Sequence, residues 1–160
     1  MKNTKNPSAI LLTRQKLPKL NISEKEIEEG VSKGAYILHK EDNPDAILFT
    51  TGSEAHLAVE ICSLINKKIQ IINLPCWELF EKQDIKYQKK VLTSNCLVVG
   101  IEAASPMGWD KWLHAGWRKN KNNFFVGMND FGASAPAGDL YEHFGITEEN
   151  VINKVKENFN

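Results

Sequence analysis

Short and almost continuous apolar runs alternate with helix-like segments along most of this chain. The runs are AILLT (9–13), AILFTT (46–51), IQIINL (69–74), CLVVGIE (96–102) and FFVGM (124–128). An apolar run without polar alternation is typical of a strand that is covered on both faces. Because these runs alternate with helical segments, the sequence predicts an α/β sandwich with a largely parallel sheet.

The helix-like segments carry recognisable start signals. Ser53 is expected to cap a helix over about residues 53–66. Thr147 is expected to cap a final helix, TEENVINKVKENF, whose apolar residues recur every fourth position and should therefore pack on the core. Shorter helices are predicted over 77–92 and 109–117.

Residues 14–34 break this alternation. They are polar, contain one proline, and join the run at 9–13 to the next strand candidate, AYIL (35–38). Ser23 and Glu26 have the spacing of a capping box, which suits a short helix. We therefore expect a linker here, and the run at 9–13 can belong to a separate folding unit.

Composition excludes several classes of protein. The 160 residues carry 20 Lys and Arg against 20 Asp and Glu, which argues against a nucleic-acid-binding surface. No apolar run is long enough to span a membrane, and the first residues lack the apolar core of a signal peptide. Cys62, Cys76 and Cys96 are odd in number and form no C-x-x-C pair. We expect free thiols and a cytoplasmic protein.

The candidate catalytic residues do not form a set. TTGSE (50–54) ends a strand and opens a helix, but it lacks a P-loop lysine, so a plain turn is favoured over a phosphate site. The four histidines have no metal-ligand spacing. No nucleophile, base and orienting group occur together. The chain itself is predicted to contain no catalytic centre, metal or cofactor.

Glu102 and a group of tryptophans follow one of the predicted strands. Glu102 lies at the carboxyl end of the run 96–102, where α/β proteins bind their ligands. Three roles stay open for it: a site residue, a cap of the neighbouring helix, or a contact with another subunit. Trp109, Trp112 and Trp117 are expected to pack in a core or in an interface.

A stretch of small residues separates the last apolar run from a short amphipathic segment. Residues 132–138 (GASAPAG) have almost no side-chain volume. Such residues allow another element or a ligand to come close to the backbone. The alternative is a loop that only crosses the end of the sheet.

Several motifs together resemble transketolases. FGASAPAGDLYEHFGITEENV resembles the C-terminal signature of that family, and LLTRQKLP (11–18) resembles its S-R-Q-N-L-P segment. VGIEAASPMGWDKWL (99–113) is similar to the family's V-E-A-x-x-x-x-G-W strand and loop. GAYIL, PDAILFTTGSE and FEKQDIKYQKKVL also match. The motifs occur in the family's order, so the resemblance covers essentially the whole chain.

The resemblance implies a three-layer α/β/α sandwich with a mostly parallel, mixed sheet of about five strands. Residues 1–20 would be the tail of a preceding pyrimidine-binding domain, 21–34 a linker, and 35–160 a transketolase C-terminal domain. The enzyme would transfer a two-carbon ketol unit between sugar phosphates in the pentose phosphate pathway. Its thiamin diphosphate and Mg²⁺ or Ca²⁺ would be bound outside this chain, which alone should be inactive.

The resemblance also assigns residues. Arg14 matches the arginine of S-R-Q, which lines the substrate channel and holds the sugar phosphate, whereas its position alone would suggest an ion pair at a domain junction. The expected partners are the remaining transketolase domains and the second subunit of a homodimer, and the small-residue loop is a candidate for subunit contact. The candidate interface residues are Glu102, Trp109, Trp112, Phe131 and Ser134.

A second interpretation stays open. The chain could be a non-catalytic module that serves dimerisation or binds a regulatory ligand. Related thiamin enzymes, such as 2-oxoacid dehydrogenase components, use a similar domain for contacts with subunits or partners.

Overall fold

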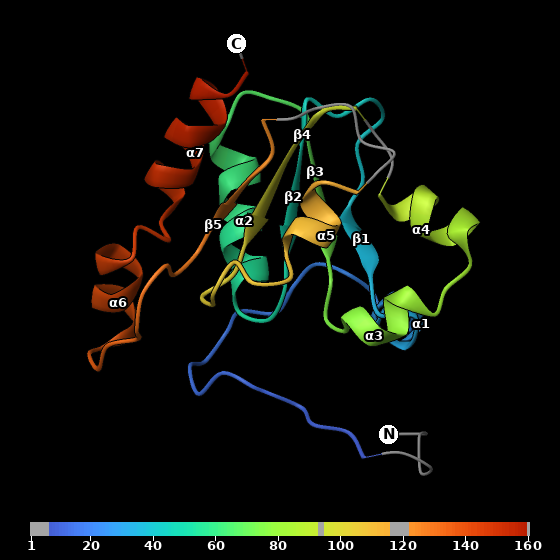
Figure 1. The fold of residues 1–160 in the computed structure, drawn as a ribbon, viewed down its shortest axis with the longest axis horizontal. Helices are drawn as coiled ribbons and strands as arrows, with labels where there is room; N and C mark the ends of the chain where they lie inside the picture. The colour runs from blue at the N-terminus through green and yellow to red at the C-terminus, as the bar shows by residue number, and fades with distance from the viewer. Residues whose placement is uncertain (1–6, 93–94, 116–121, 160) are drawn as a thin grey trace.

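The computed structural model describes residues 7–92, 95–115 and 122–159 and shows a five-stranded sheet with helices on both faces (Figure 1). The strands are β1 (Tyr36–His39), β2 (Ala46–Thr50), β3 (Ile69–Asn73), β4 (Leu97–Ile101) and β5 (Phe124–Val126). The helices are α1 (Glu24–Lys33), α2 (Glu54–Leu64), α3 (Trp77–Glu81), α4 (Ile85–Val91), α5 (Asp110–Leu113), α6 (Ala137–His143) and α7 (Glu148–Glu157).

The sheet is mixed and mostly parallel, as predicted. Its strand order is β1-β3-β2-β4-β5, with β1 antiparallel to β3 and the other pairs parallel. The four parallel strands therefore end at the same margin, which we call the carboxyl edge. The turns after β2 and β4, and the segment after β5, all begin at this edge.

The apolar run at residues 9–13 does not form the strand that its sequence predicts. Leu11 and Leu12 are 94% and 84% exposed, and the segment runs outside the body of the molecule (Figure 1). A strand needs a hydrogen-bonded neighbour to be stable, and none of the described strands pairs with this segment. The fifth strand of the sheet is instead β1.

The linker region 21–34 contains helix α1, with the predicted capping box. The Ser23 hydroxyl accepts a hydrogen bond from the Glu26 N–H at 3.3 Å, and the Glu26 carboxylate accepts one from the Ser23 N–H at 3.2 Å. The helix ends at Gly34, whose φ is +84°. A Cβ at Gly34 would lie 2.3 Å from the Cys76 carbonyl oxygen, so glycine lets this turn pack against α3.

The two faces of the sheet bury different kinds of side chain. Helices α2 and α7 cover one face with an aliphatic core, which includes Leu48, Leu57, Ile61, Ile71, Val99, Val151 and Val155. Helices α3, α4 and α5 cover the other face, whose core contains the aromatic residues Phe49, Phe80, Trp109 and Trp112. The α/β/α sandwich is thus confirmed.

Two of the helix predictions need correction. Ser53 makes no capping hydrogen bond to α2, because its own backbone is already helical (φ −65°, ψ −30°). The segment 77–92 forms the two helices α3 and α4 instead of one. The cap of α7 is confirmed, since Thr147 Oγ1 accepts from the Asn150 N–H at 3.3 Å. Of the helix expected over 109–117, residues 109–115 are described, and only Asp110–Leu113 of them form helix α5.

Candidate functional site at the carboxyl edge

Glu102 directly follows β4 at the carboxyl edge. The Trp109 indole Nε1 donates a hydrogen bond to Glu102 Oε2 at 2.7 Å. Burial raises the pKa of Glu102; the bond from Trp109 opposes this shift, and the nearby charge of Glu54 adds to it. This contact is with an indole side chain and not with a backbone N–H at the start of α5, so it decides none of the three roles left open by the sequence.

Glu54, the first residue of α2, is the most connected polar side chain at this edge. It is only 4% exposed. Its Oε1 accepts hydrogen bonds from the Tyr141 hydroxyl on α6 and from the Ser53 hydroxyl, the latter at 2.7 Å. Its Oε2 accepts from the Ala103 backbone N–H at 3.2 Å. One carboxyl group therefore links the start of α2 to α6 and to the loop after β4.

The Glu54–Tyr141 contact also affects the tyrosine. Burial, together with the hydrogen bond to Glu54, raises the pKa of Tyr141 to about 12. The Tyr141 hydroxyl consequently keeps its proton, and with it the hydrogen bond that it donates, throughout the neutral range.

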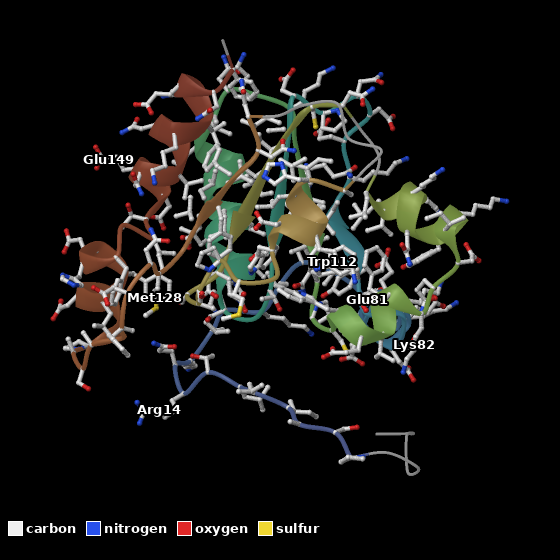
Figure 2. All side chains as sticks on the ribbon, in the orientation of Figure 1. Arg14, Glu81, Lys82, Trp112, Met128 and Glu149 are labelled. Atoms are coloured by element: carbon white, nitrogen blue, oxygen red, sulfur yellow. The ribbon has the colours of Figure 1, made fainter. Side chains whose placement is uncertain are left out.

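Trp109 and Trp112 lie in the core and are 0% and 2% exposed. The Trp109 ring centroid lies 5.5 Å from that of Trp77 and 5.3 Å from that of Phe125, and Trp112 packs against Phe80 at 5.2 Å. Figure 2 shows Trp112 on α5, inside the molecule. These are the contacts of the core alternative, and side chains so buried leave no surface for another chain. Trp117 lies outside the described residues.

Phe131 and Ser134 are exposed on the small-residue loop. Phe131 is 93% exposed. The loop leaves the sheet at Met128, whose N–H donates to the Ala104 carbonyl oxygen at 2.9 Å. Ser105, Met128 and Phe131 line one shallow, open depression. The segments after β4 and β5 thus meet at the carboxyl edge.

Arg14 lies apart from the side chains at the carboxyl edge. It is exposed, and Figure 2 shows it on the N-terminal segment with its side chain directed away from the body of the molecule. The structure therefore does not bring Arg14 and Glu102 into one site.

The polar side chains at the carboxyl edge, Glu54, Glu102 and Tyr141, link segments of the fold by internal hydrogen bonds and offer little for catalysis. Both oxygens of Glu54 already accept hydrogen bonds, and a buried carboxyl group at the start of α2 opposes phosphate binding in the 50–54 turn. In the part of the chain that is described, no three His, Cys, Asp or Glu side chains are grouped as metal ligands. The described helices include none with the length and apolar character needed to cross a bilayer.

Sequence reasoning missed Glu54 and Tyr141. They are 87 residues apart and come from helices separated by three strands in the chain. The only local signal was a glutamate at a helix start, which commonly interacts with the helix dipole at the surface. Its burial could have been inferred only from the placement of α6.

Comparisons with known proteins identify the fold's relatives. A family model described as the transketolase-like TK C-terminal domain matches residues 34–147. A transketolase of Sinorhizobium medicae is 42% identical over 161 aligned positions, which cover 98% of this chain and 22% of that protein. The solved structure of a Pichia stipitis transketolase with sedoheptulose 7-phosphate is 32% identical, with a TM-score of 0.78, over 91% of this chain and 20% of that one.

A third relative agrees with these two. The Leishmania mexicana transketolase structure is 37% identical, with a TM-score of 0.73, over 82% of this chain and 18% of that chain. The chain described here spans about a fifth of the length of the proteins that it matches.

Proposed function

The chain belongs to the transketolase-like C-terminal domain family, and from this we propose that it acts as the C-terminal part of a transketolase. The observation that carries the proposal is the extent of the match: 98% of this chain aligns at 42% identity with a transketolase, but only 22% of that enzyme is covered. The complete enzyme would transfer a two-carbon ketol unit between sugar phosphates of the pentose phosphate pathway.

Catalysis belongs to other parts of that enzyme. Thiamin diphosphate and Mg²⁺ or Ca²⁺ are held by the other domains, and the polar cluster of this chain is engaged in internal hydrogen bonds. The isolated chain is inactive. Residues 1–20 belong to the preceding pyrimidine-binding domain, 21–34 to a linker that contains α1, and 35–160 to the C-terminal domain.

The partners of the chain are the remaining domains and a second subunit. The exposed apolar side chains at residues 10–12 suit packing against a preceding domain, since Leu11 and Leu12 are 94% and 84% exposed here. Phe131 and Ser134 on the small-residue loop face the second copy of a homodimer. The free thiols of Cys62 and Cys76 fit a cytoplasmic location.

Arg14 binds the phosphate of the sugar substrate. Its guanidinium presents a planar fork of donors that matches phosphate oxygens. The exposure of Arg14, away from the body of this domain, leaves the side chain accessible to a substrate held by a neighbouring domain.

A chimeric enzyme tests the function. This chain replaces the matching C-terminal fifth of the Sinorhizobium medicae transketolase, and ketol transfer is measured. We expect an active enzyme. A folded, cofactor-loaded chimera without ketol transfer would contradict the proposal and favour a module of another kind.

Arg14→Ala in that chimera tests the phosphate contact. Because one charge-assisted hydrogen-bonded contact is lost, kcat/KM for phosphorylated sugars should fall by about ten- to a hundredfold. The value for an unphosphorylated sugar should hardly change. Lys16→Ala, which removes an exposed charge two residues away, is the control. An equal loss on both sugars would make Arg14 a junction residue.

A further inference from the structure

Helix α6 contributes no buried residue to the core, although it lies between two buried elements of the chain. None of its residues from Ala137 to His143 is classed as buried. Figure 1 shows it at the outer margin of the molecule, away from the sheet. With seven residues it is also too short to be stable without tertiary contacts. Its Tyr141, and Phe144 just after it, are half-buried and pack against the aliphatic core, so a polar contact can add to an attachment that lacks a fully buried side chain.

Glu54 supplies the polar part of that attachment. The half-buried Tyr141 on α6 donates its hydroxyl hydrogen bond to Glu54 Oε1, and Ser53 donates to the same oxygen at 2.7 Å. Glu54 itself is fixed at the start of α2, where it is 4% exposed. The placement of α6 therefore combines partial apolar packing with a hydrogen bond to a carboxyl group that is itself buried.

The same carboxyl group also fixes the other end of the loop that leads to α6. Glu54 Oε2 accepts from the Ala103 N–H at 3.2 Å, and the next residue, Ala104, accepts from the Met128 N–H at 2.9 Å. Met128 begins the loop, and the Pro136 carbonyl oxygen accepts from the Leu140 N–H of α6 at 3.2 Å. Residues 129–136 are thus attached at both ends to segments that contact Glu54.

This loop presents the most exposed aromatic side chain at the carboxyl edge. Phe131 is 93% exposed, and its N–H donates to the Asp130 carboxylate at 2.7 Å, which fixes the turn before it. Met107, two residues after the Ser105 of the same depression, is 82% exposed. Large apolar side chains gathered at one edge indicate a contact surface.

We propose that Glu54 is a positioning residue: it holds both ends of the 129–136 loop so that Phe131 is presented to the second subunit. This inference rests on the subunit contact proposed above. Residues 132–135 of this loop are small, and without its attachments the loop would sample many conformations. Association would then have to order it, which weakens binding.

Hydrogen exchange on the full 160-residue chain tests the attachment. Tyr141→Phe keeps the ring and removes only the hydroxyl. Because a hydrogen bond to a carboxylate is lost, exchange at the α6 amides of Leu140 and Phe144 should rise by about ten- to a hundredfold, while α7 amides keep their protection relative to the control.

Tyr87→Phe is the matched control. The Tyr87 hydroxyl is likewise part-buried and donates to the Ala35 carbonyl oxygen at 2.8 Å, on the opposite face of the sheet. Its loss should leave α6 exchange unchanged. If Tyr141→Phe raises α6 exchange no more than Tyr87→Phe does, the inference is wrong.

A double-mutant cycle shows whether Glu54 is the partner through which Tyr141 acts. Glu54→Ala alone should open α6, and adding Tyr141→Phe should then change α6 exchange by less than about twofold, since the shared bond is already absent. Full additivity of the two substitutions would overturn the inference. If Glu54→Ala does not fold, the comparison of Tyr141→Phe with Tyr87→Phe still decides the matter.

Sedimentation of the chimeric transketolase separates this inference from the function on which it rests. Phe131→Ala should raise the subunit dissociation constant, and Tyr141→Phe should raise it in the same direction, whereas Tyr87→Phe should not. An effect of Phe131→Ala without one of Tyr141→Phe overturns the role of Glu54 alone. If Phe131→Ala has no effect on the dissociation constant, the subunit contact in the proposed function is wrong, even if Tyr141→Phe raises hydrogen exchange in α6.

Discussion

Helices α6 and α7 follow each other in the chain but are held on the domain by different means. α7 buries Val151 and Val155 completely against α2 and the sheet. α6 buries no residue fully: Tyr141, and Phe144 just after the helix, pack half-buried against the same core, and the Tyr141 hydroxyl donates to the carboxyl group of Glu54. In Figure 1 α7 lies beside α2, whereas α6 lies at the outer margin. The two neighbouring helices thus differ in how deeply their side chains are buried in the core of the domain.

The difference matters because the two kinds of attachment fail in different ways. Burying a valine contributes about 1.5–3 kcal/mol, and a hydrogen bond to a charged group contributes a similar amount. The valines of α7 belong to a core shared with the sheet, so their loss weakens the whole domain. α6, which has half-buried side chains and one polar attachment through Tyr141, can open while the rest of the domain stays folded.

The largest expected effect is on α7. Val151→Ala should lower the free energy of unfolding by about 2 kcal/mol, from two lost methyl groups and the cavity that they leave. Urea unfolding followed by circular dichroism measures it. Val59→Ala on α2, where the side chain is 41% exposed, is the control and should change little. A local opening of α7 without loss of global stability would contradict the contrast.

The connection between the two helices gives the next effect. Gly145 has a φ of +66°, and a Cβ there would lie 3.1 Å from Asn150 Nδ2, which donates to the Gly145 carbonyl oxygen. Gly145→Ala should destabilise the domain by about 1–2 kcal/mol, because an L-residue is strained in this conformation. Thermal unfolding measures the change.

Gly138 is the matched control for Gly145. It lies inside α6, and a Cβ there would meet no atom within 4 Å. Gly138→Ala should therefore strengthen α6 by about 0.5–1 kcal/mol, since alanine favours helix more than glycine. Opposite signs at the two glycines are expected; equal destabilisation at both would show that α6 is packed more tightly than its exposure indicates.

The smallest effect concerns the charge beside Glu54. Burial raises the pKa of Glu102 in the folded chain, so the stabilising contribution of its protonated form is complete below the usual carboxyl range, about 4.3, and is lost as the pH rises through the raised value. Glu102→Gln does not titrate and removes the neighbouring charge. It should stabilise the domain slightly at neutral pH and have no such advantage at acidic pH.

Unfolding of wild type and Glu102→Gln across pH measures this difference, and exchange at α6 shows where it acts. A Gln side chain can still accept the Trp109 hydrogen bond, so packing should be preserved. A loss of stability at neutral pH would mean that the charge itself strengthens the bond from Trp109 more than burial opposes it.

Local patterns were sufficient to predict α7 but not the attachment of α6. The threonine cap and the valine spacing of α7 are sequence features within a few residues, and the structure confirms both. The Glu54–Tyr141 bond joins residues 87 positions apart, and only the assembled fold brings them together. The division of segment 77–92 into α3 and α4, by contrast, has a local signal: the Asp84 carboxylate accepts from the Tyr87 N–H and caps α4. The helix-like pattern over 77–92 as a whole obscures that signal.

The run at residues 9–13 shows the opposite limit. Its composition predicts a buried strand, yet Leu11 and Leu12 are exposed. The apolar composition of a segment predicts that it is buried, but it does not identify the part of the protein against which the segment packs. The family resemblance had already assigned this run to a preceding domain, and the structure gives it no partner among the described strands.

The two edge strands of the sheet limit how this domain can contact other chains. β1 has four residues and a register shift between Ile37 and His39, and β5 has only three residues. Short or irregular edge strands offer few aligned backbone groups to an incoming strand, which protects a protein from edge-to-edge aggregation. The sheet is therefore poorly suited to growth by strand addition, and recognition of another chain falls to side chains at its surface.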